Sequence, residues 1–415
     1  MSITRRESAL HLLTSTSQVV TGNTTRTEPE NRAFYPALDG LRAVAFLMVL
    51  LEHYNQFPWG WAGVDLFFVL SGFLITGILF DSQNDTYRVR NFYVRRTLRI
   101  FPLYYGILLL ILFLWPLVHW QLSWAWMVWP AYLGNFARFL HPYVLFSPAQ
   151  RMADFQPTGV LAGQPFTLYL GHFWSLCVEE QFYLVWPWVV FWIRDRRKLM
   201  WCCGVTLAVC LPLRLLGQHL FPQWMLDNEV LYRFTPLRLD ALLLGGLMAL
   251  ALRGPSAANV LRYARRLTPL CMAAAVYLLA AFVYQHLHHR MPTYPEWKFT
   301  WGLAVVDVLS GATILLAIQP GTFVYRALNR PALRWLGRIS YGAYVWHDIP
   351  HNLYTRLALW LWPSHYKELV PVLGLCGTLV LASLSFRLLE TPFLNLKERW
   401  TIRGRAVTSL PAEVS

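Results

Sequence analysis

Charged residues are scarce in this sequence of 415 residues, where Asp, Glu, Lys and Arg together make up only 14%. A soluble domain usually carries about 25% charged residues, so the composition argues against a soluble globular protein. Cysteine is also rare: the six cysteines lie in apolar stretches, form no CxxC motif and have no histidine at the spacing of metal ligands. We therefore expect neither a disulfide framework nor a metal site.

Hydrophobic residues are abundant instead, at 56% of the chain, together with 20 Trp and 20 Tyr. Long apolar segments separated by short basic loops are typical of a multi-pass membrane protein, and Trp and Tyr favour the membrane interfaces. The net charge of +14 is spread over these loops, which indicates membrane topology rather than nucleic-acid binding. We expect a protein of the inner (plasma) membrane, with the lipid bilayer but no nucleic acid among its partners.

We predict an all-α fold, a polytopic bundle of about ten transmembrane helices with both termini cytoplasmic, because ten spans place every basic cluster on one side. The predicted spans cover residues 37–56, 62–81, 100–118, 173–193, 199–217, 236–252, 268–285, 299–318, 339–361 and 368–389. The Trp-rich stretch 124–140 is interpreted as interfacial or re-entrant, since an eleventh span would move the basic cluster at 194–198 outside. The polar stretch 141–172 is then external.

The two ends of the chain differ in composition from the apolar region between them. Residues 1–33 are rich in Ser, Thr, Arg and Glu, and no basic segment followed by an apolar core marks a cleavable signal peptide. This composition predicts a flexible cytoplasmic lead. We therefore divide the chain into that lead, a transmembrane domain at 34–394 and a cytoplasmic tail at 395–415.

Two ionisable residues share one face of the first span. Arg42 and His53 are eleven residues apart, which is close to three helical turns, so they lie roughly 16 Å apart along the same face. Ionisable groups in hydrocarbon are expensive and are functional candidates by default. A neutral imidazole is suited to taking a proton from an alcohol near neutral pH. The alternative is a buried histidine satisfied by hydrogen bonds within the bundle.

Carboxylates near these residues have two interpretations each. Asp65, near the outer start of the second span, either orients the imidazole of His53, a role that Glu52 could also fill, or caps the helix N-terminus. Glu179 and Glu180 lie inside an apolar segment, where they either pair with Arg42 or another buried arginine, or position the site.

An arginine cluster precedes the third span. Arg95, Arg96 and Arg99 are spaced three and four residues apart, so either pair forms a cationic helix face. Guanidinium groups bind phosphate oxygens through bidentate contacts, which points to a phosphorylated cytosolic cofactor. The positive-inside rule is the alternative explanation of the charge. Two further features are interpreted structurally: Ser71–Gly72 as a site of close helix packing, and His347 as a packing or positioning residue.

Taken in order, these stretches resemble the integral-membrane acyltransferase-3 family of bacterial O-acyltransferases. The resemblance runs from about Tyr35 to Pro392. Its matching pieces are LDGLRAVAFLMVLLEH, GVDLFFVLSGFLI, FYVRRTLRIFPLYY, LGNF, FWSLCVEEQFYLVWP, RLDALLLGG, LGRISYGAYVWH and LLETP.

The resemblance implies ten transmembrane helices with both termini inside, as the charge pattern does. It implies that Arg42 and His53 form an Arg-x10-His pair with His53 as the essential catalytic residue. It also implies that Arg96 and Arg99 form an RxxR motif for the phosphates of acyl-CoA, and Glu179 falls within the family's SLxVEE segment. We expect the stand-alone class, without an SGNH-type esterase domain.

The expected function is transfer of an acyl group, most simply acetyl, from cytosolic acetyl-CoA or another acyl-CoA to a hydroxyl acceptor. The acceptor is a carbohydrate, a lipid-linked glycan or another alcohol of the envelope. His53 acts as general base, supported by Arg42, Asp65 and Glu179, and a transient acyl-histidine is the second mechanism. A transporter or flippase is the alternative function, because intramembrane charges also mark ion pathways.

Overall fold

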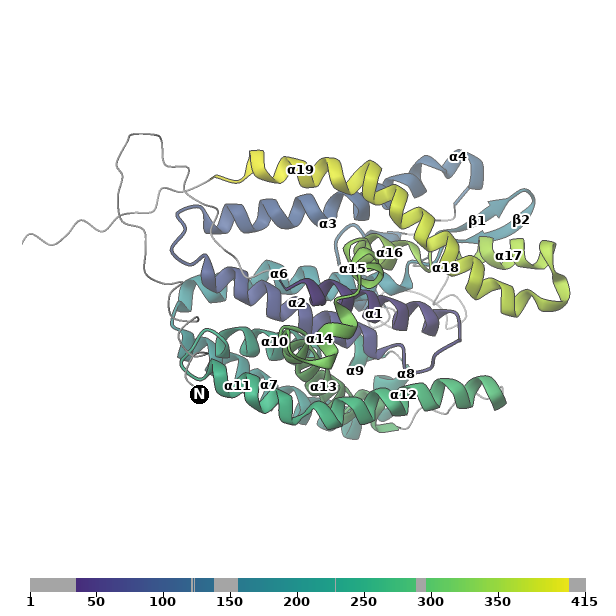
Figure 1. Ribbon diagram of the computed structural model, residues 1–415. Coiled ribbons are helices and arrows are strands. Elements are labelled where there is room, and N and C mark those ends of the chain that lie inside the picture. Colours follow the sequence, from purple (N-terminus) through teal and green to yellow (C-terminus); the bar gives the residue numbers. More distant parts are fainter. Residues whose placement is uncertain are drawn as a thin grey trace, which may run out of the picture. The chain divides into compact units, whose positions relative to one another are not determined.

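The computed structural model describes residues 35–120, 122, 124–137, 156–227, 229–288 and 296–402. Helices dominate this part of the chain, as predicted (Figure 1). The strands among the described residues are β1 (Thr158–Leu161) and β2 (Gln164–Thr167), which form one antiparallel hairpin.

The helices that precede the hairpin are α1 (Pro36–His53), α2 (Ala62–Asp81), α3 (Arg88–Phe113), α4 (Trp115–Val118), and the 3₁₀ turns η1 (Trp124–Val128) and η2 (Gly134–Phe136). Those that follow it are η4 (Gly171–Phe173), α6 (Trp174–Ile193), α7 (Arg196–Leu220), α8 (Pro222–Asp227), α9 (Val230–Arg233), η5 (Thr235–Leu237), α10 (Leu239–Ala251), α11 (Ala257–Arg266), α12 (Thr268–His288), η6 (Glu296–Phe299), α13 (Trp301–Ala317), α14 (Phe323–Leu328), α15 (Pro331–Arg338), α16 (Ser340–Trp346), α17 (His351–Leu361), η7 (Pro363–His365), α18 (Tyr366–Ser385), the π-helix η8 (Phe386–Glu390) and α19 (Thr391–Trp400).

Every predicted span falls on a helix, with two departures. Helix α3 begins at Arg88, well before the predicted start at residue 100, so the arginine cluster that precedes the predicted span lies on the same helix. Arginine is a good helix former. A cluster of arginines therefore indicates the side of the membrane on which it lies, but it does not indicate a loop. The predicted span 339–361 is interrupted, since α16 ends at Trp346 and α17 begins at His351.

Length and composition single out fewer helices than the predicted ten. Four described helices are long and apolar enough to cross a membrane, namely α2, α3, α7 and the continuous helix Pro363–Trp400. The bent pair of α11 and α12 makes a fifth if it is one span, and α10 and α13 are shorter apolar helices. The counts of spans and the cytoplasmic placement of both termini therefore stay predictions.

The segment interpreted as interfacial or re-entrant forms no long helix within its described part. Residues 124–137 fold into the short 3₁₀ turns η1 and η2, and 138–140 lie outside the described residues. A 3₁₀ turn of this length is far too short to cross a bilayer. The decision not to count this segment as a span is thus confirmed for the residues that are described.

The ends of the predicted domain are only partly described. Residues 1–33 lie outside the described part of the chain, and so does the end of the tail from residue 403. Helix α19 continues past residue 394 to Trp400, and the domain boundary there stays a prediction. The first part of the predicted tail is therefore helical.

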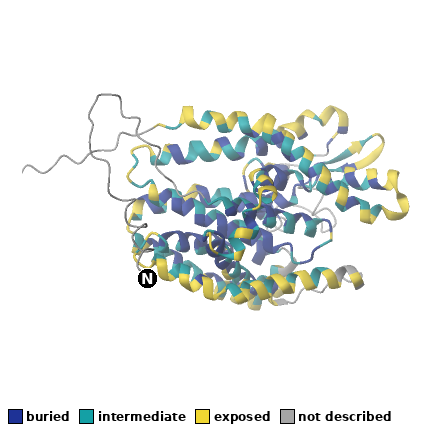
Figure 2. Ribbon diagram, in the orientation of Figure 1, coloured by how far each residue is buried: buried dark blue, intermediate teal, exposed yellow. Residues whose placement is uncertain are grey.

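Helix α2 lies at the centre of the packing, against α1, α6, α10 and α13. Figure 2 shows it largely in the buried colours, whereas the exposed colour is widespread on α12. Helices α7 and α12 expose large apolar side chains, among them Trp201, Leu216, Val276 and Leu279. Contiguous exposed apolar surface of this kind is what a lipid-facing helix presents, and the chain is accordingly a membrane protein.

Close contact between α2 and α10 depends on glycine. A Cβ added at Gly72 would lie 1.7 Å from the carbonyl oxygen of Leu242, and one at Gly245 would lie 1.9 Å from that of Val69. The helix backbones approach closely at small residues in membrane bundles. The Ser71–Gly72 pair was predicted to allow such packing, and the structure confirms it for Gly72.

Gly72→Ala is expected to lower the stability of the solubilised protein by about 1–3 kcal/mol, because the added methyl group forces α2 and α10 apart. Gly204→Ala in α7 is the matched control, since nothing lies within 4 Å of a Cβ at that position. Thermal unfolding in detergent measures both variants. Equal unfolding temperatures for the two would contradict the packing account.

Candidate functional site

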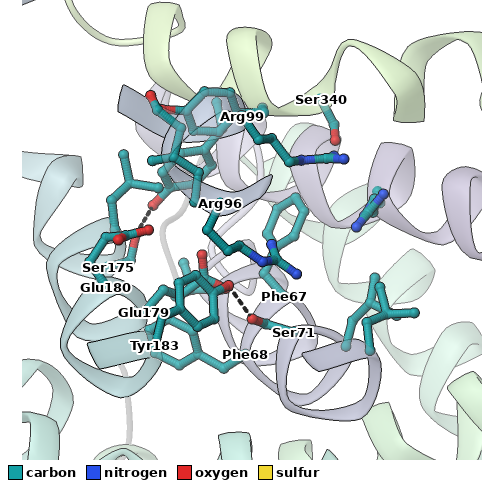
Figure 3. Close-up of a pocket in the computed structure, with 18 residues that line it drawn as sticks. Phe67, Phe68, Ser71, Arg96, Arg99, Ser175, Glu179, Glu180, Tyr183 and Ser340 are labelled. Atoms are coloured by element: carbon teal, nitrogen blue, oxygen red, sulfur yellow. Dashed lines mark hydrogen bonds between the residues drawn. The ribbon is translucent and has the colours of Figure 1, made fainter. Parts of the chain in front are cut away.

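A pocket lies between α2, α3, α6 and α16, close to the start of α1 (Figure 3). Arg42 on α1, Arg96 and Arg99 on α3, and Glu179 and Glu180 on α6 all line it. Together with Ser71 on α2, the structure therefore brings together six of the residues singled out from the sequence, Arg42, Ser71, Arg96, Arg99, Glu179 and Glu180. We call this the arginine pocket.

Within the arginine pocket, Arg96 and Arg99 make no hydrogen bond or ion pair with any described residue. The guanidinium carbon of Arg96 instead lies 5.0 Å from the centre of the Tyr183 ring, and Figure 3 shows both guanidinium groups among the pocket side chains. Arg95 does not line the pocket. Of the two arginine pairs considered, Arg96 with Arg99, three residues apart, is thus the pair that lines the pocket.

The carboxylates and hydroxyls of the arginine pocket come mainly from α6. The guanidinium of Arg42 contacts the Asp39 carboxylate at 3.4 Å, so its ion pair lies one turn earlier on α1 rather than with Glu179. Tyr183 and Ser71 share a hydrogen bond of 2.5 Å between their hydroxyl oxygens, which joins α6 to α2. Two carboxylates and three guanidinium groups line the pocket, and because Arg42 also contacts Asp39, Arg96 and Arg99 are the guanidinium groups placed to bind an anion.

His53 ends α1 and is half-buried. Its Nδ1 lies 3.0 Å from the carbonyl oxygen of Val49, one turn back. A carbonyl oxygen can only accept, so Nδ1 carries the proton and Nε2 keeps a free lone pair. This is the tautomer in which Nε2 can take a proton from a hydroxyl group.

His53 does not line the arginine pocket but belongs to a second group of side chains. Its ring centre lies 4.7 Å from that of His347 and 6.3 Å from that of His172, and these two rings lie 4.6 Å apart. We call these three residues the histidine cluster. His347 was noted from the sequence, whereas His172 was missed because it lies in a stretch interpreted as an external loop.

Tyr344 on α16 connects the two groups. It lines the arginine pocket, while its ring centre lies 5.4 Å from that of His347 and 5.7 Å from that of His172. Its hydroxyl lies 2.5 Å from Ser175 Oγ, and Ser175 also lines the pocket. Tyr344 therefore lies beside both the arginine pocket and the histidine cluster.

Asp65 takes neither of the roles considered for it. Its carboxylate forms a fully buried ion pair with Arg238, and α2 begins at Ala62 without a side-chain cap. A buried charge requires a partner, and α10 brings Arg238 to this position from far along the chain. The same region holds a second buried pair, Arg214 with Asp240 at 2.5 Å.

Comparison with protein families shows the family to which the chain belongs. A family model described as an acyltransferase domain matches residues 35–388. The chain is 30% identical to the peptidoglycan O-acetyltransferase OatA of Listeria monocytogenes over 398 residues, which is 88% of this chain and 57% of OatA. It is 28% identical over 382 residues to YrhL of Bacillus subtilis, provisionally named a peptidoglycan O-acetyltransferase, covering 88% of this chain and 55% of YrhL.

The chain therefore spans a little over half the length of these relatives. No solved structure matches it.

Proposed function

Because this chain belongs to the acyltransferase family, we propose that it transfers an acetyl group from acetyl-CoA to a hydroxyl of a cell-wall glycan. The names of its relatives support acetylation of a peptidoglycan hydroxyl. The alternative function, a transporter or flippase, is not favoured by any of these comparisons. Residence in the inner membrane, with the acetyl donor approaching from the cytoplasm, is part of the proposal.

The observation that carries the proposal is the pair of unpaired guanidinium groups in the arginine pocket. Arg96 and Arg99 line it without a hydrogen bond or ion pair to a described residue, although Glu179 and Glu180 lie near Arg96 and Glu390 lies near Arg99. Both arginine side chains are only partly buried, so their N–H groups are accessible to an anion. Phosphate oxygens are well matched to guanidinium groups, so we assign the phosphates of acyl-CoA to this pair.

Acyl transfer requires a base for the acceptor hydroxyl, and His53 supplies it. Its Nε2 removes the hydroxyl proton as the oxygen attacks the thioester carbonyl, the carbon–sulfur bond breaks, and coenzyme A leaves as the thiolate. Arg42 and Glu179 hold the donor side of the site. A transient acyl-histidine at His53 is the second mechanism, in which His53 itself attacks the thioester, coenzyme A leaves as the thiolate, and the acceptor hydroxyl then attacks the acyl group and frees His53.

Arg96→Ala is expected to raise the KM for acetyl-CoA by about 10-fold to 100-fold, because a hydrogen bond to a charged group contributes about 1.5–3 kcal/mol. The rate at saturating acetyl-CoA should change little. Steady-state kinetics of the purified protein at several acetyl-CoA concentrations measure both parameters.

Arg90→Ala is the matched control for this variant, because Arg90 is an exposed arginine on the same helix. It should keep the KM of the unaltered protein. An unchanged KM in Arg96→Ala, or an equal rise in both variants, would remove the phosphates from this pocket.

A further inference from the structure

The histidine cluster contains buried nitrogen atoms that the proposed mechanism leaves unused. His172 Nε2 lies 3.0 Å from the Val345 carbonyl oxygen, and His347 Nδ1 lies 2.6 Å from that of Tyr344. Each ring therefore donates its N–H to a carbonyl, as His53 does. The other nitrogens, His172 Nδ1 and His347 Nε2, are closed to solvent and have no hydrogen-bond partner among the described residues.

A buried acceptor without a donor is destabilising, so two of them beside one another call for an explanation. A substrate hydroxyl cannot fill this need, because both atoms are closed to solvent. The source of a proton has to lie inside the cluster. His53, whose ring contacts both others, is the side chain that gains a proton in the proposed reaction.

The cluster continues to an acidic residue near the surface. Asp348 Oδ2 lies 3.9 Å from His172 Nδ1, and Asp348 Oδ1 lies 3.4 Å from His351 Nδ1. The side chain of Asp348 is 14% exposed and that of His351 is 27% exposed. The contacts thus lead from buried imidazoles to a partly solvated carboxylate.

The remaining polar groups around His347 do not offer another route. Tyr54 donates its hydroxyl proton to the backbone carbonyl of His347 at 2.8 Å. The hydroxyl of Tyr344 is held by Ser175 and by the backbone of His172. The titratable side chains that face the His347 ring from the packed elements are therefore His53, His172, Tyr344 and Asp348.

We propose that His347, His172 and Asp348 form a proton relay that resets His53 after each acyl transfer. The inference rests on the proposed function, since it needs a proton taken up by His53. After the acceptor ester has formed, the proton on His53 Nε2 passes to His347 Nε2, then to His172 Nδ1, and then to the Asp348 carboxylate. Asp348 gives it to water at the surface, while the coenzyme A thiolate takes a proton from the solvent on its own side.

The imidazoles of the relay stay neutral at rest. Burial, with a smaller contribution from the nearby His53, lowers the pKa of His172 to about 3, because desolvation disfavours the imidazolium. A proton therefore does not settle on this ring but moves on to the anionic carboxylate of Asp348, which supplies the counter-charge. His172 and His347 are positioning and relay residues rather than catalytic residues.

Two substitutions separate the relay from a structural role. The amide nitrogen of asparagine replaces Nδ1 of histidine, and that of glutamine replaces Nε2. His347→Asn and His172→Gln therefore keep each hydrogen bond to the backbone and remove only the unpaired nitrogen. His365→Gln is the matched control, because His365 is 54% exposed and lies on η7, next to Trp362.

The test uses the full chain in detergent, labelled acetyl-CoA, and soluble N-acetylglucosamine–N-acetylmuramic acid oligomers as the acceptor probe. Each relay variant should lose about 10-fold to 100-fold in kcat, keep its KM for acetyl-CoA, and show a larger solvent deuterium isotope effect than the unaltered protein. The control should match the unaltered protein. A structural role would instead predict normal kinetics in both variants, since the backbone hydrogen bonds remain.

Wild-type kcat and isotope effect in His347→Asn and His172→Gln, with an active unaltered protein, would overturn the relay and leave the proposed function standing. No transfer by the unaltered protein would contradict the proposed function and the relay with it. If His347→Asn lowers the unfolding temperature, Asp348→Asn is measured in its place. The relay predicts the same loss of kcat in Asp348→Asn, and full activity of that variant would contradict the relay.

Discussion

Replacing His53 with asparagine is expected to lower kcat for acetyl transfer by about 10²-fold to 10⁴-fold, the range that a general base contributes. Asparagine retains an N–H near the position of Nδ1, so the hydrogen bond to Val49 and the end of α1 should persist. Only the lone pair of Nε2 is removed. The effect is measured as the rate at which equal amounts of folded protein form the labelled acetyl ester of the glycan.

His365→Asn provides the control for His53→Asn, since it makes the same change at an exposed histidine. It should transfer acetyl groups at the rate of the unaltered protein. A rate within about threefold of the unaltered protein for His53→Asn, well inside the effect of losing a base, would remove His53 from the chemistry. It would direct attention to the hydroxyl groups of the arginine pocket.

Asp65→Ala is expected to destabilise the protein by about 3–5 kcal/mol, because it removes the carboxylate that pairs directly with the buried guanidinium of Arg238 and leaves only the more distant Asp240 and Asp307. Both side chains of the pair are fully buried. The predicted phenotype is poor accumulation and a lower unfolding temperature in detergent, not a selective loss of catalysis. This separates Asp65 from the candidate site, in which the sequence had placed it.

Two controls define the Asp65 prediction. The double variant Asp65→Leu/Arg238→Met removes both charges and should recover most of the lost stability. Asp81→Ala breaks an ion pair with Arg253 whose side chains are 45% and 29% exposed, and it should cost at most about 1 kcal/mol. A similar loss in Asp65→Ala and Asp81→Ala would show that burial does not govern the pair.

The sequence predicted the helices well, because hydrophobic length is a local property. Helix α2 covers the predicted residues 62–81, and α6 begins within one residue of its predicted start. The interruption at His347 to Pro350 was not predicted, although Asp348 and the helix breaker Pro350 lie inside the predicted span. The apolar residues on both sides of the break outweighed these signals.

The pairings could not be predicted, because they join residues far apart in the chain. Arg238, the partner of Asp65, lies 173 residues further along the chain, and no local pattern links the two. His172 gave no signal at all, since a histidine in a polar loop is ordinary. The phosphate-binding arginines, in contrast, were partly predicted. Helical spacing left two possible pairs, and the pocket beside α6 contains the pair Arg96 and Arg99.

The most direct test of the account is acetyl transfer by the purified full chain, with labelled acetyl-CoA as donor and soluble peptidoglycan oligomers as acceptor. The account predicts base-labile label on the glycan, one coenzyme A thiol released for each ester formed, and neither product with His53→Asn. Folded protein that leaves both acetyl-CoA and the glycan unchanged would contradict it.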